Sequence, residues 1–408
     1  MVISLEVQRM TACYNKAESV LELESRIQYK TDDELAAAAL FCGYPDALLY
    51  FAAACCVFYI LIGIPGNLIT IVALARYKKV RNAAAIFIIN LHISDFIFCA
   101  MILPMTATTF AQKHWTFGVI MCRVYPYFKY TLNATSIFTV LAISINRYVI
   151  VCHPLLYPRL YKRRNISIMI LMLWASPYII FLPSALGIWG RFDLERNGGF
   201  CTMLEDQHHS APKNFFLCLA FIVPYTTIML CYARIWWVVR KTAKKSQNQH
   251  ARPTHLSLSR TQSSTTLNEK RFISFAPSAS GNSILDEEKS TSVTTTPDED
   301  KTLEKYFKAP FRLTRKEVRP KAPTRRDKKL RPIIAAIMIS YCISHLPIML
   351  TRLIYKEYML EPVANVVSHL FEYSGNCINP IIYVLMSKEY RLAYKSLFEA
   401  ISKKFQRH

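Results

Sequence analysis

The sequence predicts an all-α membrane protein, a seven-transmembrane helix bundle with a short amphipathic cytoplasmic helix. The first observation is a series of long apolar runs, because about 20 apolar residues are needed to cross the ~30 Å hydrocarbon core as a helix. Four runs contain no charged residue and three contain only a few. The runs are residues 47–75, 82–112, 118–151, 165–190, 214–233, 332–351 and 362–387.

The second observation is the distribution of basic residues between these runs. An odd number of spans places the two termini on opposite sides, and short basic loops stay in the cytoplasm. Residues 76–81 and residues 159–164 each contain four basic residues, whereas the second outer loop mixes bases with acids. We therefore expect a multi-pass protein of the plasma membrane with its N-terminus extracellular.

The composition divides the chain into five predicted parts. They are an extracellular tail (1–46), five helices (47–240), a cytoplasmic loop (241–327), two helices (328–387), and an amphipathic helix with the tail (388–408). The loop is basic and rich in Ser and Thr, which is typical of disorder. It is a candidate target for kinases and arrestin, although a solvated linker explains it equally well. No apolar segment precedes residue 47, so no cleavable signal peptide is expected.

The net charge of +22 does not indicate nucleic-acid binding. Basic residues concentrate in the segments 241–331 and 387–408, which are predicted to face the anionic inner leaflet. We therefore expect contact with membrane lipids and not with nucleic acid. The sequence contains no metal-ligand cluster, phosphate-binding glycine loop or nucleophile triad, so no enzymatic activity is predicted.

The third run carries functional candidates at both of its ends. Cys122 and Arg147 are 25 residues apart, which is about 37 Å along a helix and close to a bilayer thickness. Cys122 is expected to form a disulfide with Cys201 on the oxidising side. At the other end, Asn146, Arg147 and Tyr148 form a candidate activation switch. A second pair, Cys13 with Cys42, is a weaker expectation.

Asp95 is the single carboxylate of the second run, and a charge inside the membrane is a functional candidate because its burial is costly. Polar residues of other runs are predicted to surround it and could hold a sodium ion, namely Asn67, Ser136, Asn376 and Asn379. A purely structural hydrogen-bond network is the alternative interpretation. No other cofactor is predicted.

The last run contains a candidate hinge. Pro380 removes one backbone hydrogen bond and permits a bend. Asn379 and Tyr383 lie one turn apart on the same helix face. We expect these three residues to move together during activation.

Taken in order, these residues resemble those of the rhodopsin-like (class A) G-protein-coupled receptors over about residues 47–398. The matching positions are Gly66, Asn67, 91–95, Trp115, Cys122, 146–148, Trp174, Pro224, Tyr232, Pro347 and 379–383. Within that family the chain is similar to the arthropod moody and trapped-in-endoderm receptors. The resemblance implies that an extracellular ligand opens an inner cavity for a heterotrimeric G protein. It also implies a role in epithelial or glial barrier formation or in cell migration.

The chain departs from the family pattern at two positions. Asn146 replaces the usual aspartate before the arginine, so we hypothesise that Asp327 restrains Arg147 instead. His345 replaces the tryptophan of the sixth span. It is interpreted either as a modified switch or as a hydrogen-bonded core histidine.

Lys129 marks the predicted ligand end. It lies five helical turns before Arg147 and so faces the outer half of the bundle. A lysine there disfavours the cationic amines that similar receptors bind through an aspartate. Two interpretations stay open: Lys129 binds an anionic ligand such as a lipid headgroup, or it pairs with Glu372. The other predicted pocket residues are His345, Arg352, His369 and Tyr373.

Two other classes are kept as alternatives. A transporter would also use Lys129, Glu372 and Asp95, but it would favour an inverted repeat, and none is visible in the sequence. A scaffold receptor without signalling activity is the second alternative, which a measurement of G-protein turnover would separate.

Overall fold

The computed structural model describes residues 29–77, 82–196, 198–205, 212, 215–216, 219, 222–250, 336, 339–351 and 361–406. Asp327, Arg352 and most of the predicted cytoplasmic loop lie outside these residues. The chain divides into two units, Met1–Ser246 with Lys321–His408, and Gln247–Pro320. The bundle of helices lies in the first unit, and only the last residues of the helix Val223–His250 extend into the second.

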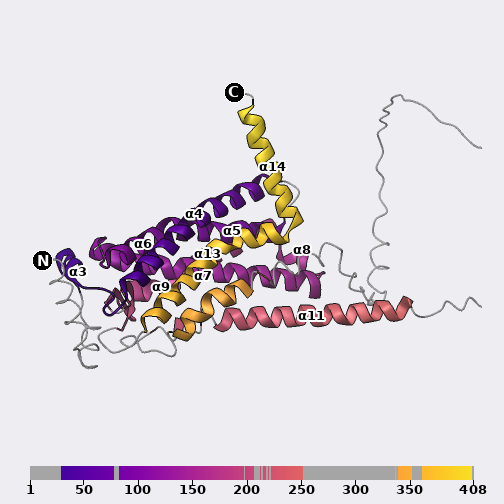
Figure 1. The fold of residues 1–408 in the computed structure, drawn as a ribbon. Helices are drawn as coiled ribbons and strands as arrows, with labels where there is room; N and C mark the ends of the chain where they lie inside the picture. Colours follow the sequence, from indigo (N-terminus) through magenta and orange to yellow (C-terminus); the bar gives the residue numbers. More distant parts are fainter. Residues whose placement is uncertain are drawn as a thin grey trace, which may run out of the picture. The chain divides into compact units, whose positions relative to one another are not determined.

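Helices form nearly all of the described structure (Figure 1). In chain order they are α3 (Asp32–Ala37), α4 (Asp46–Arg76), α5 (Ala83–Ile97), the π-helical turn η2 (Phe98–Ile102), α6 (Leu103–Gln112), α7 (Gly118–Cys152), α8 (Tyr157–Leu160), α9 (Arg163–Ala185), α11 (Val223–His250), α13 (Pro362–Met386) and α14 (Lys388–Phe405). A further apolar helix covers Ile339–Thr351. Each of the seven predicted runs therefore contains a helix.

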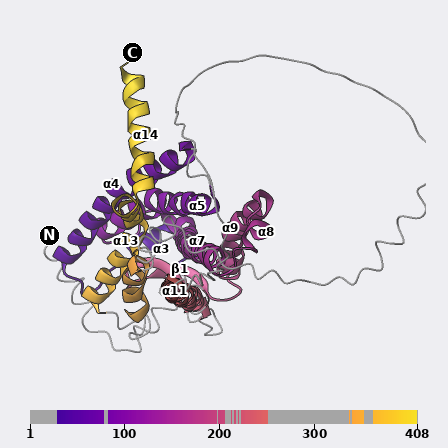
Figure 2. The same ribbon diagram turned by 90° about the vertical axis from the view of Figure 1, so that its right-hand side faces the viewer.

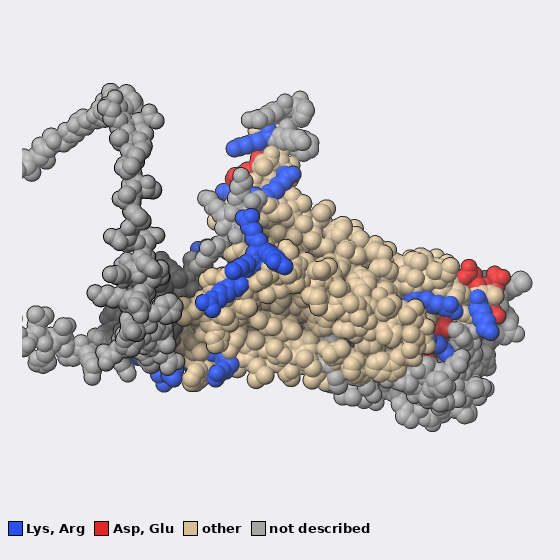
Figure 3. Space-filling model, turned by 180° about the vertical axis from the view of Figure 1, so that it is seen from behind, with Lys and Arg blue, Asp and Glu red and all other residues tan. Residues whose placement is uncertain are grey.

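Four helices in the described part of the chain are long and apolar enough to cross a membrane. They are α4, the continuous element α5–η2–α6, α7 and α9. On the face shown in Figure 3, the charged side chains gather towards the two ends, and the region between them is almost free of charge. This distribution fits a band of membrane-facing surface, because charged side chains avoid the hydrocarbon core.

The β1–β2 hairpin caps one end of the bundle. Strand β1 (Arg191–Glu195) pairs antiparallel with β2 (Phe200–Leu204), with Leu194 opposite Cys201. The disulfide between Cys122 and Cys201 joins β2 to the start of α7. The end that carries this disulfide is called the outer end, and the opposite end the inner end.

Helix α7 occupies the middle of the bundle. It contacts α5 on one side and α9 on the other, and its outer part touches both strands (Figures 1 and 2). Helix α4 packs against α13, α6 and α5. Three apolar clusters lie among the described residues. One is at the outer end around Trp115 and Tyr373, one at the inner end around Phe87 and Tyr383, and a smaller one around Phe181 of α9 and Phe192 of β1.

Helix α11 is longer than predicted. It continues to His250, ten residues beyond the predicted end of the fifth helix at residue 240. The additional residues are mostly Lys, Gln, Ser and Ala, and the straight-chain residues and alanine among them favour helix even where no apolar face is buried. The first ten residues of the predicted cytoplasmic loop, 241–250, are therefore helical.

The predicted amphipathic helix after the last span is confirmed as α14. Its buried side, formed by Tyr390, Ala393 and Leu397, belongs to the inner core, while Lys388 and Lys395 are exposed. The Tyr394 hydroxyl hydrogen-bonds to Thr70 of α4. Arg391 donates to the carbonyl oxygens of Val384 and Leu385 at the end of α13, at 3.2 and 2.8 Å.

Thr70→Val is expected to loosen α14, because it removes the hydroxyl that bonds to Tyr394 and to the Gly66 carbonyl. The expected loss is about 1 kcal/mol of unfolding free energy, typical of one hydrogen bond. Thermal unfolding in nanodiscs measures it, with Thr70→Ser as the control that keeps the hydroxyl. Equal midpoints for all three proteins would show that this bond does not contribute.

The outer tail shows no periodicity in the sequence, yet its residues from Tyr29 onwards are folded. Helix α3 begins with a capping box, in which Thr31 accepts a hydrogen bond from the Glu34 amide and the Glu34 carboxylate accepts one from the Thr31 amide. Hydrogen bonds from the amides of Lys30 and Thr31 hold the pKa of Glu34 below its ordinary value. Residues 29–45 of the tail are therefore a structured part of the outer end.

Candidate functional site

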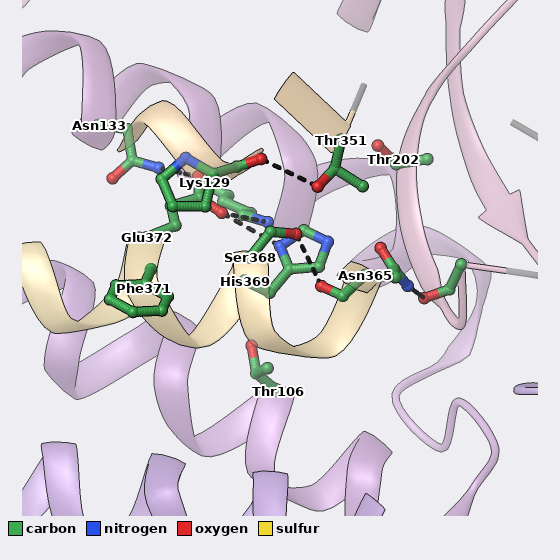
Figure 4. Close-up of polar contacts among 12 residues, drawn as sticks. Thr106, Lys129, Asn133, Thr202, Thr351, Asn365, Ser368, His369, Phe371 and Glu372 are labelled. Carbon is green, nitrogen blue, oxygen red and sulfur yellow. Dashed lines mark hydrogen bonds and ion pairs between the residues drawn. The ribbon is translucent and has the colours of Figure 1, made fainter. Parts of the chain in front are cut away.

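A buried ion pair between α7 and α13 lies at the centre of the outer half (Figure 4). The Lys129 Nζ is 3.4 Å from the Glu372 Oε2, and both side chains are only 7% exposed. The Asn133 amide donates to the Glu372 Oε1 at 2.8 Å, and the His369 Nδ1 lies 3.1 Å from the Oε2. The ammonium also sits over the Tyr373 ring, 5.3 Å from its centre.

The ion pair is stabilised because both of its charges have further partners. A buried salt bridge offsets its desolvation cost only when additional hydrogen bonds satisfy the remaining lone pairs. Here Asn133 and His369 supply them to Glu372. The structure thus contains the predicted pairing of Lys129 with Glu372. Binding of an anionic ligand by Lys129 stays a prediction.

His345 belongs to the same region of the bundle. Its ring is buried, lies 5.2 Å from the ring of Tyr341, and is within electrostatic range of Glu372. Of the predicted pocket residues, Lys129, His369, Glu372 and Tyr373 contact one another, with His345 nearby. Arg352 lies outside the described residues.

Asn376 links the ion pair to the inner half. Its side-chain amide donates to the Asn133 Oδ1 at 3.4 Å, and its carbonyl accepts from the Asn67 amide at 3.0 Å. The Asn67 Oδ1 in turn accepts from the His92 Nδ1 at 2.6 Å. Asn67 and Asn376 were predicted to surround Asp95. These hydrogen bonds instead join α4, α5, α7 and α13 to one another, and none of them involves the Asp95 carboxylate.

Two of the predicted neighbours contact Asp95 directly. The Ser136 hydroxyl donates to the Asp95 Oδ1 and the Asn379 amide to the Oδ2, both at 2.8 Å. A further hydroxyl, that of Ser94, lies 2.8 Å from the Ser136 Oγ. Asp95 thus joins α5, α7 and α13 in one fully buried cluster.

The oxygen atoms of this cluster fit the predicted sodium ion in chemistry, because hard cations prefer carboxylate, hydroxyl and amide oxygens. The Asn379 Oδ1 is buried and has no hydrogen-bond partner among the described residues, so it offers one more ligand. Sodium binding at Asp95 stays a prediction.

The candidate switch lies at the inner end. Asn146 is fully buried, close to the Tyr161 hydroxyl. The Arg147 guanidinium lies within electrostatic range of the hydroxyls of Tyr232 and Tyr383. The Tyr148 hydroxyl instead bonds to the His153 Nε2 at 3.1 Å on the exposed side. The proposed partner Asp327 lies outside the described residues.

The candidate hinge is surrounded by aromatic rings. Pro380 lies inside α13, where a Cβ added at Gly66 of α4 would be 3.3 Å from its ring. The Tyr383 ring stacks on Tyr390 at 5.0 Å and meets the His92 ring edge to face at 5.4 Å. The hinge is thus in contact with α4, α5 and α14.

The predicted disulfide between Cys122 and Cys201 is confirmed, with the two Cα atoms 5.2 Å apart. Cys42 is also disulfide-bonded, and Cys13, its expected partner, lies outside the described residues. Near this bridge, burial raises the pKa of Asp193 in β1, although the Leu194 amide and Arg191 oppose the shift.

Several residues of the network were not anticipated from the sequence. They are Asn90, His92, Ser94, Asn133 and Thr139. Asn90 connects three helices, since it accepts from Trp174 of α9 and donates to Thr139 of α7, both at 2.8 Å. Asn133 could have been found, because it lies one turn after Lys129 on the same face.

Comparison with known proteins defines the class. Residues 66–383 match the family described as "7 transmembrane receptor (rhodopsin family)". The chain is 35% identical over 360 residues to "G-protein coupled receptor moody" of Drosophila melanogaster, covering 87% of this chain and 52% of that relative. It is 30% identical over 365 residues to "Protein trapped in endoderm-1" of the same organism, covering 89% and 81% respectively.

The solved structure of squid rhodopsin shows the same fold, with a TM-score of 0.62 and 23% identity, over 88% of this chain and 87% of that chain. The chain therefore belongs to the rhodopsin family of seven-transmembrane receptors. It spans about half the length of the moody relatives that it matches. The predicted seven-helix membrane fold is confirmed, and the transporter and scaffold alternatives find no support.

Proposed function

We propose that the chain is a plasma-membrane receptor that converts binding of an extracellular anionic ligand into activation of a heterotrimeric G protein. The main support is the continuous polar path along α13. It begins at Glu372, passes Asn376 and reaches Asn379, and at each step it bonds to another helix. A change at the ion pair can therefore be transmitted to the hinge at Pro380.

The proposed ligand is an amphiphile with an anionic headgroup, such as a lysophospholipid or a fatty acid. Lys129 is a buried cation whose carboxylate partner belongs to a different helix. A ligand anion could replace Glu372 at Lys129 without leaving the ammonium unpaired, which would otherwise be costly. Glu372 would keep His369 on its own helix, and α13 would lose its ionic contact with α7.

The proposed docking surface for the G protein is at the inner end of the bundle. Leu155, directly after α7, is 67% exposed, and Leu156 is 44% exposed. Basic residues Arg159, Arg163 and Arg164 follow close by. The proposal also includes phosphorylation of residues 241–327 and arrestin binding to them. It includes a role in barrier formation or cell migration because the chain resembles the moody and trapped-in-endoderm receptors.

Nucleotide exchange on a panel of Gα subunits tests this function. The full chain in nanodiscs should accelerate exchange when anionic lipids are added, and Arg147→Ala should abolish the acceleration. Lys129→Ala should lower the potency of the active lipid by at least about tenfold, because a charge-assisted contact is lost. No acceleration on any Gα would refute the proposal, and unchanged potency with Lys129→Ala would refute the anionic ligand.

A further inference from the structure

The N-terminal segment, residues 29–45, packs into the outer end of the bundle. Its buried apolar side chains are Tyr29, Leu35, Ala38, Leu40, Phe41 and Tyr44, and all of them belong to the outer core. That core also contains Phe110, Phe200 and Tyr373. A tail without sequence periodicity therefore contributes to the same apolar core as the helices.

Polar contacts fix the segment to the start of α7. The Asp32 Oδ1 accepts a hydrogen bond from the Val119 amide at 2.7 Å. A carboxylate is favourable there, because the first amides of a helix lack partners and the helix dipole is positive. Gly118 has a φ of 78°, and a Cβ at this position would lie 3.0 Å from the Asp32 carboxylate. The close approach thus suits glycine.

Two further contacts fix the segment to the hairpin and to α13. The Phe41 amide donates to the Arg196 carbonyl at 3.1 Å, just after β1. The Asn365 amide, in the first turn of α13, donates to the Tyr44 hydroxyl at 2.9 Å. The segment is therefore held by three elements that surround the candidate ligand site.

Phe41 is the central side chain of this contact. It is 4% exposed, stacks on Phe110 at 5.4 Å, and meets Phe200 edge to face at 5.5 Å. Its φ of 58° is rare for a bulky residue, and such conformations persist only where the surrounding packing enforces them. A Cβ at Gly199 would overlap the Phe41 ring, so the ring fills space that only glycine leaves free.

The contacts continue from Phe41 to the ion pair. The Phe200 ring meets the His369 ring edge to face at 5.5 Å. His369 in turn places its Nδ1 3.1 Å from the Glu372 Oε2, and Figure 4 shows both residues on the same helix. Phe41 is thus two side chains away from the carboxylate that pairs with Lys129.

We propose that residues 29–45 are a built-in component of the ligand site, a plug whose Phe41 ring positions Phe200 and His369 and so keeps Glu372 on Lys129. An anionic amphiphile that separates Glu372 from Lys129 must also shift this plug. Phe41 is therefore a positioning residue that sets the threshold for activation. The inference rests on the proposed function, which it extends.

Hydrogen–deuterium exchange of the full chain in nanodiscs tests the plug without a ligand or a G protein. Phe41→Ala is expected to raise exchange in residues 362–376 of α13 by about fivefold or more, since the three aromatic contacts of its ring are lost. Phe58→Ala is the matched control, because Phe58 of α4 is 59% exposed. Unchanged exchange with Phe41→Ala, or an equal rise with Phe58→Ala, would overturn the inference.

Phe41→Leu covers the case in which Phe41→Ala does not fold. It keeps an apolar side chain but loses the ring contacts, so exchange in residues 362–376 should rise by about twofold, and an unchanged value would overturn the inference. Basal nucleotide exchange on Gα is measured on the same samples and should rise with both variants. Faster hydrogen exchange without activation of any Gα would support the plug and refute the proposed function.

Discussion

Glu372→Gln is expected to destabilise the protein by about 3–5 kcal/mol, the usual cost of leaving a buried charge without its partner. The substitution keeps the size of the side chain and one acceptor for Asn133 or His369. It removes the negative charge 3.4 Å from the Lys129 ammonium, which is buried within the bundle. The cost therefore arises mainly from Lys129.

A double-mutant cycle measures this interaction. Thermal unfolding in nanodiscs is compared for the wild type, Glu372→Gln, Lys129→Met and the double variant. The double variant should recover much of the stability, because replacing a whole buried pair by uncharged groups is far less costly than breaking it. The matched control is Glu399→Gln, whose exposed partner Lys395 lies 3.9 Å away on α14. That pair should contribute less than about 1 kcal/mol.

The same variant also bears on activation. If the ion pair holds α13 against α7 in the resting state, Glu372→Gln should raise basal nucleotide exchange, as a displacing anion would. If the unfolding free energy of Glu372→Gln is within about 1 kcal/mol of the wild-type value, the buried Lys129 ammonium does not require Glu372 as its partner. Reduced stability with unchanged basal exchange would separate the structural role of the pair from the proposed switch.

The sequence was sufficient for features that depend on one helix or on simple chemistry. Long apolar runs predict spans whatever their neighbours are, since only a helix satisfies its own backbone within a membrane. The outer position of Cys122 left Cys201 as its natural partner, and the structure contains this bond. The carboxylate of Asp95 predicted a polar cluster because a buried charge requires partners.

The rest depended on how the helices are rotated against one another. Asn67 and Ser136 are both polar residues within apolar runs, yet Ser136 hydrogen-bonds to Asp95, whereas Asn67 turns towards His92 and the backbone of α13. No periodicity within one helix determines which polar residue of a neighbour it meets. Asn133 shares a helix face with Lys129, but the sequence does not show that it meets Glu372, which is 239 residues away.

The packing of the N-terminal segment was even less accessible. Helix α3 has only six residues, too few for a periodic pattern. Phe41 adopts a left-handed conformation that a phenylalanine alone would not indicate, and it depends on the space left by Gly199. Such contacts are specified jointly by distant segments, so they become visible only in the folded chain.

Asp95→Asn is expected to weaken the coupling of α5, α7 and α13 where the three helices meet at this residue. Both carboxylate oxygens accept a hydrogen bond, from Ser136 and from Asn379. An amide at this position offers only one oxygen and no charge, so one of the two present hydrogen bonds to this side chain is lost and its donor must reorient. The expected cost is about 1–3 kcal/mol.

The same substitution tests the sodium prediction. A cation bound to Asp95 would join three helices and stabilise the state in which they are together, by an amount that grows with its concentration. The unfolding midpoint of the wild type should therefore be higher in sodium chloride than in choline chloride at equal ionic strength. With Asp95→Asn the two salts should give the same midpoint. If the wild type has the same unfolding midpoint in both salts, the cluster is a hydrogen-bond network without an ion. The lower stability of Asp95→Asn is then the only expected effect of the substitution.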